Sequence, residues 1–142
     1  MNNVMLADAQ QPSEIVLCRL LVCSVPATVL FDSGASHSFV SRAFVEHAEL
    51  HPHGLPQQLS IVSPGSKTNS TAFVPDVEIN IQGAIFSASP IVLARSDIDV
   101  ILGMDWLVKY KAKIYCPSKT VLLTHDSGAE VWYTCGSIAG ST

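Results

Sequence analysis

Hydrophobic and polar residues alternate most clearly between positions 76 and 82. Val77, Ile79 and Ile81 would share one side of an extended strand, with polar residues on the other side. This period of two is typical of a half-buried β-strand. Shorter apolar runs bounded by glycine, proline or polar residues predict further strands at 15–23, 27–31, 59–62, 84–88, 90–94, 100–103, 113–116, 120–123 and 130–133.

Two segments have a helical pattern instead. Between residues 38 and 50 the apolar side chains fall near one face, and either Ser38 or Ser41 can cap the first turn. Two prolines within residues 51–56 end this helix. A shorter helix is predicted at 104–110. About nine short strands with two short helices predict a mostly β domain, either a closed barrel or a compact sandwich.

The chain divides into one folded domain and two short ends. Residues 1–13 are polar and predict a flexible N-terminal linker, residues 14–136 form the predicted domain, and residues 137–142 form a C-terminal tail. Within the domain, the polar residues 63–70 predict an exposed loop. A chain of 142 residues is too short for two well-formed domains.

Composition excludes several classes of protein. With 48% hydrophobic and 14% charged residues the chain is not intrinsically disordered. The longest weakly polar stretch, residues 20–31, contains Ser24, Pro26 and Thr28 and is shorter than the roughly 18–20 apolar residues of a membrane span. A net charge of −4 argues against nucleic-acid binding. So few charges leave much apolar surface on a small domain, which favours an obligate oligomer.

The four cysteines predict the cellular setting. Cys18, Cys23, Cys116 and Cys135 show no C-x-x-C spacing, and the N-terminus lacks a basic region followed by an apolar core. We therefore expect reduced thiols, with neither a disulfide nor a zinc site, in the cytosol or in a particle assembled there.

A candidate for catalysis follows the strand at 27–31. Asp32 would be held at the end of a rigid, buried element, Ser33 supplies a hydroxyl, and Gly34 allows a sharp turn and the close approach of another chain. Taken alone, Asp-Ser-Gly is more often a simple strand-to-turn connection. Two such carboxylates side by side would share one proton and hold a water between them.

A longer stretch around Asp32 gives the tripeptide a family context. Residues 29–41, Val-Leu-Phe-Asp-Ser-Gly-Ala-Ser-His-Ser-Phe-Val-Ser, strongly resemble the active-site segment of retropepsin-like aspartic proteases, most closely those of gypsy-type LTR retrotransposons. Residues 99–107, Asp-Val-Ile-Leu-Gly-Met-Asp-Trp-Leu, resemble the apolar strand, glycine and helix of the same family. The resemblance covers roughly residues 14–133. It implies the retropepsin-like closed β-barrel, the single-lobe acid protease fold.

The resemblance also implies roles for individual residues. Asp32 corresponds to the catalytic aspartate, Ser33 to the position whose hydroxyl reaches across the dimer interface, and Gly34 to the glycine beside the substrate. Gly103 corresponds to the glycine that braces the active-site loop, and the flap that folds over the substrate should lie within residues 59–74. Substrate-binding positions are then Ala35, Ser36, His37, Pro64, Gly65 and Ser66.

The implied function is that of an aspartic endopeptidase active as a homodimer. Water would be activated between the Asp32 carboxylates of two copies, with no metal and no cofactor, to hydrolyse an extended peptide of a retrotransposon polyprotein. The setting would be the cytoplasm or virus-like particles within it, with no nucleic-acid or membrane partner. Two alternatives remain: a catalytically silent dimerisation or binding module of the same fold, and a host proteasome-shuttle protease of the retropepsin type.

A second Asp-Ser-Gly at residues 126–128 raises the possibility of two catalytic motifs in one chain. No apolar strand runs directly into it, and a strand rather than a helix follows it. A hairpin turn is therefore the better interpretation.

Two further patterns are weighed against simpler explanations. His47 and His51 have the i, i+4 spacing of zinc ligands on a helix, but Pro52 ends that helix and no third ligand is evident. Solvated histidines are the preferred interpretation. The alternating lysines at 109, 111 and 113 can touch nucleic acid, but the solvent-facing side of a strand explains them more simply.

Overall fold

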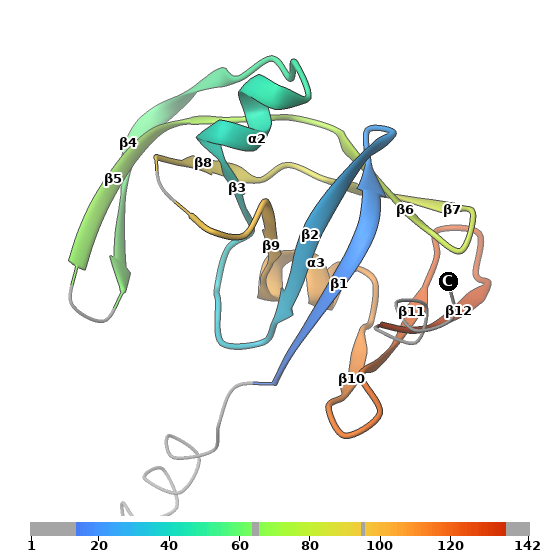
Figure 1. The fold of residues 1–142 in the computed structure, drawn as a ribbon. Helices are drawn as coiled ribbons and strands as arrows, with labels where there is room; N and C mark the ends of the chain where they lie inside the picture. The colour runs from blue at the N-terminus through green and yellow to red at the C-terminus, as the bar shows by residue number, and fades with distance from the viewer. Residues whose placement is uncertain (1–13, 64–65, 95, 136–142) are drawn as a thin grey trace, which may run out of the picture.

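The computed structural model describes residues 14–63, 66–94 and 96–135. Within these residues the chain forms strands and two short helices (Figure 1). In chain order they are β1 (Ile15–Val22), β2 (Val25–Asp32), β3 (Phe39–Ser41), α2 (Arg42–His47), β4 (His53–Ser63), β5 (Ser66–Phe73), β6 (Val77–Ile81), β7 (Ala84–Ala88), β8 (Ile91–Leu93), β9 (Val100–Leu102), α3 (Met104–Lys109), β10 (Lys113–Tyr115), β11 (Thr120–Thr124) and β12 (Glu130–Thr134).

Nine strands form one strongly curled sheet in the order β4-β5-β8-β3-β9-β2-β1-β6-β7 (Figure 1). Strand β9 lies at its centre, parallel to β2 and antiparallel to β3. Strands β10, β11 and β12 make a separate antiparallel sheet. The predicted mostly β, barrel-like architecture is confirmed.

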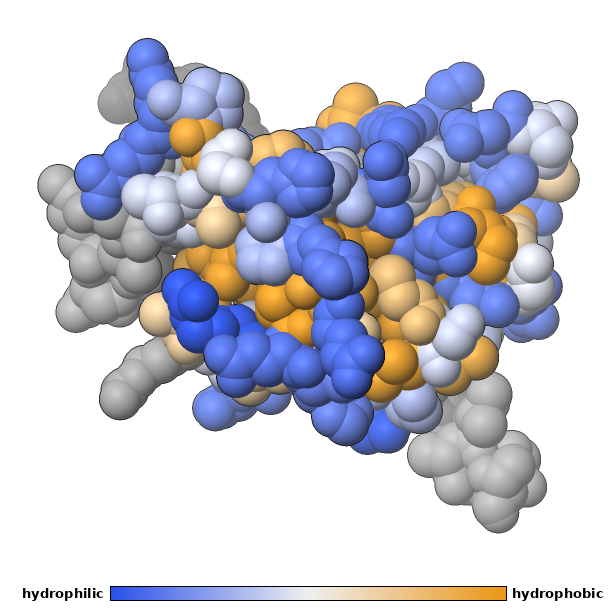
Figure 2. All heavy atoms as spheres, turned by 90° about the horizontal axis from the view of Figure 1, so that it is seen from above, coloured by the Kyte–Doolittle hydropathy of each residue, from blue (hydrophilic) through white to orange (hydrophobic). Residues whose placement is uncertain are grey.

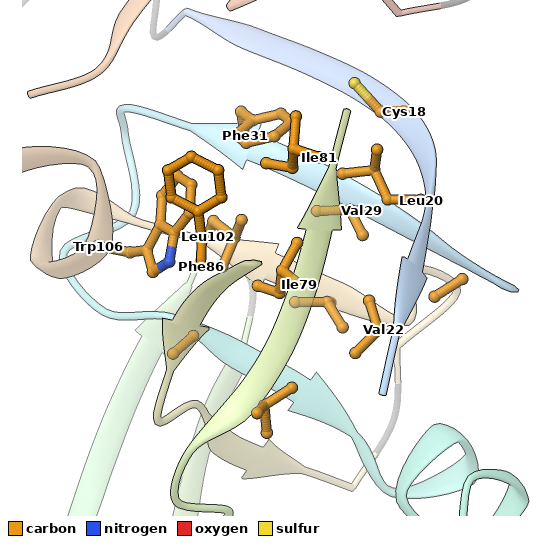
Figure 3. Close-up of a cluster of buried hydrophobic side chains, with 14 of the residues drawn as sticks. Cys18, Leu20, Val22, Val29, Phe31, Ile79, Ile81, Phe86, Leu102 and Trp106 are labelled. Carbon is orange, nitrogen blue, oxygen red and sulfur yellow. The ribbon is translucent and has the colours of Figure 1, made fainter. Parts of the chain in front are cut away.

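The core lies inside the curled sheet. Strand β1 alternates exposed and buried residues along its whole length, and Val77, Ile79 and Ile81 of β6 are at most 1% exposed, as their alternation predicts. Figure 3 shows strands β1, β2, β6 and β9 contributing apolar side chains to this cluster. Phe86 and Trp106 pack with their ring centroids 5.8 Å apart, which fastens α3 to the sheet.

The surface retains several large apolar side chains, and Figure 2 shows apolar groups between polar ones on the face seen from above. On β1, Ile15, Leu17 and Leu21 are 52%, 53% and 44% exposed. Other exposed large hydrophobic residues are Ile85, Met104, Val108, Tyr115 and Trp132. This agrees with the low charged fraction of the sequence.

The helix predicted at 38–50 is shorter in the structure. Phe39–Ser41 forms strand β3 and only Arg42–His47 is helical. Strand β3 pairs with both β8 and β9, and these long-range hydrogen bonds outweigh the local helical periodicity. Ser41 is the cap, since its hydroxyl accepts a hydrogen bond from the backbone N–H of Phe44 (3.0 Å).

The exposed loop predicted at 63–70 is mostly strand. Strand β4 continues to Ser63 and β5 begins at Ser66, and the two strands pair along this polar stretch. A hairpin ladder joins backbone groups, so an apolar pattern is not required to form it. The predicted flap residues Pro64 and Gly65 lie outside the described residues.

The expectation of four reduced cysteines is wrong for two of them. Cys18 and Cys135 form a disulfide with their Cα atoms 5.0 Å apart, and both residues are 2% exposed. The bond joins β1 to the residue that follows β12, 117 positions later. Only the folded topology brings these residues together, so sequence spacing does not reveal the pair. Cys23 and Cys116 are free thiols.

The predicted lysine face is also wrong. Lys109 ends α3, Lys111 lies in the following turn with a φ of 51°, and Lys113 begins β10. The three lysines therefore belong to different elements rather than to one side of a strand.

No helix among the described residues is long and apolar enough to cross a membrane.

Candidate active site

Asp32 is the last residue of β2, a strand held between β1 and β9. Its neighbour Phe31 is fully buried and pairs with Leu102 of β9, while Asp32 pairs with Ile15 of β1. Asp32 itself is partly exposed. Its carboxylate therefore reaches the surface from a strand that is fixed on both sides.

The turn after β2 orients this carboxylate. The backbone N–H of Gly34 donates a hydrogen bond to Oδ1 of Asp32 (2.8 Å), and the N–H of Ala35 donates to the Asp32 carbonyl (3.2 Å). A carboxylate that accepts a backbone N–H within its own turn has restricted rotation. We call residues 32–37 the catalytic loop, after the role that the sequence predicts for it.

Ser33 is hydrogen-bonded to Glu14, the residue that precedes β1. Its N–H donates to the Glu14 carbonyl (2.9 Å), and its hydroxyl accepts from the Glu14 N–H (2.8 Å). A hydroxyl is also a donor, so the Ser33 Oγ–H can still bond to another group. The predicted contact of this hydroxyl across a dimer interface needs a second copy of the chain and stays a prediction.

Gly103 lies directly against the catalytic loop. A Cβ atom at this position would be 2.6 Å from the Ala35 carbonyl oxygen and still closer to the His37 carbonyl oxygen. Only glycine allows so close an approach of two backbones. The next residue, Met104, donates its N–H to the Ala35 carbonyl (2.7 Å). The structure thus brings together the two segments that resemble the protease family.

The remaining predicted site residues are distributed differently. Ser36 and His37 are exposed, with the Ser36 hydroxyl 2.9 Å from Nδ1 of His37, and Ala35 is partly exposed. Ser66 begins β5, where it pairs with Ser63. In Figure 1 the β4–β5 hairpin extends from one end of the curled sheet.

Two residues that hold the end of this loop, Ser38 and Asp105, were not predicted as site residues, and of the two Ser38 is buried while Asp105 is exposed. Ser38 was considered only as a helix cap, yet it is 2% exposed and its hydroxyl donates to Oδ1 of Asp105 (2.6 Å). Its N–H donates to Oδ2 of Asp105 (3.1 Å), and its hydroxyl accepts from the Gly103 N–H (3.0 Å). The sequence does contain a signal for these two residues. In each of the two segments that resemble the family, a polar residue follows a glycine: Ser38 follows Gly34, and Asp105 follows Gly103.

A similar cluster holds the opposite end of β9. The N–H and hydroxyl of Thr28 both donate to Oδ2 of Asp99 (2.9 and 3.2 Å), and the Asp99 N–H donates to the Thr28 hydroxyl (3.0 Å). Strand β9 is therefore anchored at both ends by an aspartate. Only the Asp105 end adjoins the catalytic loop.

The second Asp-Ser-Gly forms the predicted hairpin turn. It connects β11 to β12, with the Gly128 N–H donating to the His125 carbonyl (2.8 Å) and the His125 N–H donating to Ala129 (2.8 Å). Asp126 is exposed. This turn belongs to the small sheet and carries none of the features found around Asp32.

The histidine pair has no zinc-site geometry in the described part of the chain, where no three histidine, cysteine, aspartate or glutamate side chains cluster to hold a metal. His47 ends α2, where its ring lies 6.3 Å from that of Phe44. His51 is exposed.

Comparisons with known proteins identify the family. The family model described as retroviral aspartyl protease matches residues 1–129. The structure resembles the retroviral protease-like domain of Ddi1 from Leishmania major, with 14% identity, a TM-score of 0.62, and coverage of 87% of this chain and 98% of that one. It also resembles EIAV protease complexed with the inhibitor HBY-793, with 22% identity, a TM-score of 0.56, and coverage of 75% and 93%.

No curated protein sequence matches the chain. At these identities the two solved structures establish the retropepsin-like fold, and the family model covers most of the sequence. The chain belongs to the retroviral aspartyl protease family.

Proposed function

We propose that this protein is an aspartic endopeptidase that acts as a homodimer, with Asp32 of each copy forming the catalytic pair. The observation that carries the proposal is the placement of Asp32. Asp32 is the last residue of β2, and its carboxylate accepts a hydrogen bond from the Gly34 N–H. The loop that follows Asp32 packs directly against Gly103. Family membership supports the same chemistry.

In the proposed reaction, one Asp32 carboxylate of the pair is ionised and the other is protonated. The ionised carboxylate takes a proton from a water as the water oxygen attacks the peptide carbonyl carbon. The protonated carboxylate gives its proton to the carbonyl oxygen, which yields a tetrahedral diol. As the diol collapses and the C–N bond breaks, the carboxylate that took the proton from water gives it to the leaving nitrogen. The other carboxylate takes a proton from a diol hydroxyl, which restores the starting pair, so no covalent enzyme intermediate forms.

A second copy is needed because the described residues contain one aspartate in this setting. The other Asp-Ser-Gly is an exposed hairpin turn. A two-fold axis beside Asp32 would bring the second carboxylate into place. Ile15 pairs with Asp32 and is 52% exposed, so burial of β1 apolar surface against the partner favours this arrangement. Residues 14–20 and 130–138 are the proposed interface, and 136–138 lie outside the described residues.

The proposed substrate is an extended segment of a polyprotein from a gypsy-type LTR retrotransposon. Sequence similarity of residues 29–41 and 99–107 to those proteases supports this origin. The peptide would lie between the β4–β5 hairpin and the catalytic loop, held by strand-like hydrogen bonds. Processing would take place in the cytoplasm or in virus-like particles.

The likeness to the Ddi1 domain from Leishmania major favours a second candidate. That domain comes from a cellular organism, and the match covers nearly all of it. The chain would then be a host retropepsin-type protease, or a dimerising module of this fold that cleaves nothing.

The decisive experiment is a digestion of denatured casein at acidic pH by the purified protein, with and without pepstatin. We expect cleavage that pepstatin blocks and that Asp32→Asn abolishes. Absence of cleavage by a folded dimer would favour the silent module. Mass spectrometry of the products then identifies the residues on either side of each cut site.

A further inference from the structure

We propose that Asp105 is a positioning residue for the catalytic loop and acts through Ser38. The inference deepens the proposed function and rests on it. Asp105 lies in the first turn of α3, outside the Asp-Ser-Gly motif, and would not touch the reacting atoms. Its carboxylate would set the geometry of the loop on which Asp32 stands.

The contacts form one continuous chain from Asp105 to the loop. Oδ1 of Asp105 accepts the Ser38 hydroxyl (2.6 Å), and Oδ2 accepts the Ser38 N–H (3.1 Å). Ser38 directly follows the loop, so both of its polar groups are held by one carboxylate. Hydrogen bonds to an ionised acceptor are stronger than neutral ones, and the 2.6 Å distance agrees with this.

The same carboxylate also fixes the segment beneath the loop. Oδ1 of Asp105 accepts the Trp106 N–H (2.7 Å), and the Ser38 hydroxyl accepts the Gly103 N–H (3.0 Å). The N-terminus of α3 has Gly103 as its cap residue, with no side-chain cap bond. Asp105 therefore joins the start of α3 to the end of the loop, and without it the Ser38 hydroxyl and N–H would lose the carboxylate that holds them.

A small displacement is enough to affect catalysis. Misplacing a reacting group by about 1 Å can cost on the order of 100-fold in rate. The Ala35 carbonyl retains its bond from Met104 when Asp105 is changed, so the loop would shift at its C-terminal end rather than unfold. We therefore expect a loss in kcat larger than any change in KM.

The chain offers two matched controls. Asp99 makes a comparable set of bonds to Thr28 at the far end of the same strand, so Asp99→Ala removes a similar anchor away from the loop. Asp76 lines the same surface pocket, of about 240 Å³, as Asp105 and Ser38. Its substitution, Asp76→Asn, removes a nearby charge and leaves the Ser38 contacts in place.

The experiment measures kcat and KM on a fluorogenic peptide chosen from a site that the wild type cuts in casein. Asp105→Ala should lower kcat by roughly 10- to 100-fold with KM within about 3-fold, and Asp105→Asn, which keeps one acceptor oxygen, should recover part of the loss. Asp99→Ala and Asp76→Asn should keep kcat within about 3-fold at a temperature where each is folded. Ser38→Ala combined with Asp105→Ala should be no worse than the more damaging single change.

Amide hydrogen exchange gives a readout that does not depend on activity. The amides of Ser38 and Gly103 should exchange faster in Asp105→Ala and at the wild-type rate in Asp99→Ala. Unchanged exchange at both amides, or a wild-type kcat in folded, dimeric Asp105→Ala, would overturn the proposal. If Asp105→Ala does not fold, Asp105→Asn takes its place in both measurements. A wild type that cleaves nothing would instead refute the proposed function, and exchange at these amides would still test the positioning.

Discussion

Phe31 and Leu102 are neighbours in parallel strands, and each directly precedes a residue of the candidate site. Asp32 follows Phe31, and Gly103 follows Leu102. Because the carboxyl ends of parallel strands lie at the same edge of a sheet, the two segments leave β2 and β9 side by side. This pairing places Gly103 against the loop that begins at Asp32, although the two segments are far apart in the sequence.

The two Asp-Ser-Gly motifs should respond differently to the same substitution. Asp32→Asn should abolish peptidase activity and leave the fold intact, because the amide can still accept the Gly34 N–H bond. Asp126→Asn should keep near-wild-type activity, since Asp126 lies in an exposed turn. Cleavage of a fluorogenic peptide and circular dichroism check both variants. Equal loss in the two would restore the single-chain, two-motif interpretation.

Gly103→Ala should both destabilise the protein and impair the site. The added methyl group would meet backbone carbonyls of Ala35 and His37, which cannot move independently of the catalytic loop. We expect the free energy of unfolding to fall by about 1–3 kcal/mol, the usual cost of overpacking. Urea denaturation measures this change. Gly54→Ala is the control, because its Cβ would meet nothing within 4 Å, and equal destabilisation of the two would contradict the close packing.

The disulfide should be detectable by counting thiols. Protein alkylated during cell lysis and then denatured should carry two labels, on Cys23 and Cys116, and four labels after prior reduction. Cys135→Ser should lower the free energy of unfolding by about 2–4 kcal/mol, because the bond closes a long loop in the unfolded chain. Cys116→Ser should change it little. Four labels without reduction would show that Cys18 and Cys135 are thiols in the cell.

Activity should depend on pH in a window below neutrality. Two carboxylates that share one proton lose the shared proton as pH rises and gain a second as pH falls. Only the singly protonated pair performs the proposed reaction, so the rate should fall on both sides. A kcat/KM profile measured between pH 3 and pH 8, a range of roughly five decades in proton concentration, tests this. A rate that still climbs at the alkaline end would contradict the shared proton.

Dimerisation should be visible in the concentration dependence of activity. If each copy supplies one Asp32, specific activity should fall on dilution below the dissociation constant of the dimer. An excess of Asp32→Asn chains should poison the wild type by forming inactive mixed dimers. Analytical ultracentrifugation gives the mass over the same concentrations. A protein that is monomeric and keeps full specific activity at every dilution would contradict the proposed homodimer.

The local pattern of apolar and polar residues was sufficient to predict those elements that have one buried side and one solvent-exposed side. Strand β6 follows its alternation, and β9 with α3 follow the apolar run and the glycine. The prediction of a helix at 38–50 was wrong for Phe39–Ser41, which form β3. This strand is stabilised by partners 50 or more residues away. Hydrogen bonding between distant strands has no signature in a single segment.

For the same reason, only some residues of the candidate site could be predicted from the sequence. Asp32 and Gly103 each stand in a segment with a recognisable context, so the sequence alone singles them out. The Ser38–Asp105 bonds join residues whose only local signal is a polar side chain that follows a glycine, and the Cys18–Cys135 bond joins residues without any such signal. Such pairs follow from the topology of the folded chain, which brings distant residues together.

Glu14 has a practical consequence for the design of expression vectors. Its two backbone hydrogen bonds to Ser33 place the entry of the chain into the domain next to the loop that carries Asp32. An affinity tag fused immediately ahead of Glu14 would therefore be attached beside the loop that carries Asp32 rather than at a remote corner of the protein. Assays should use a cleavable tag, and kinetics recorded before and after its removal would report how far upstream polypeptide obstructs the substrate.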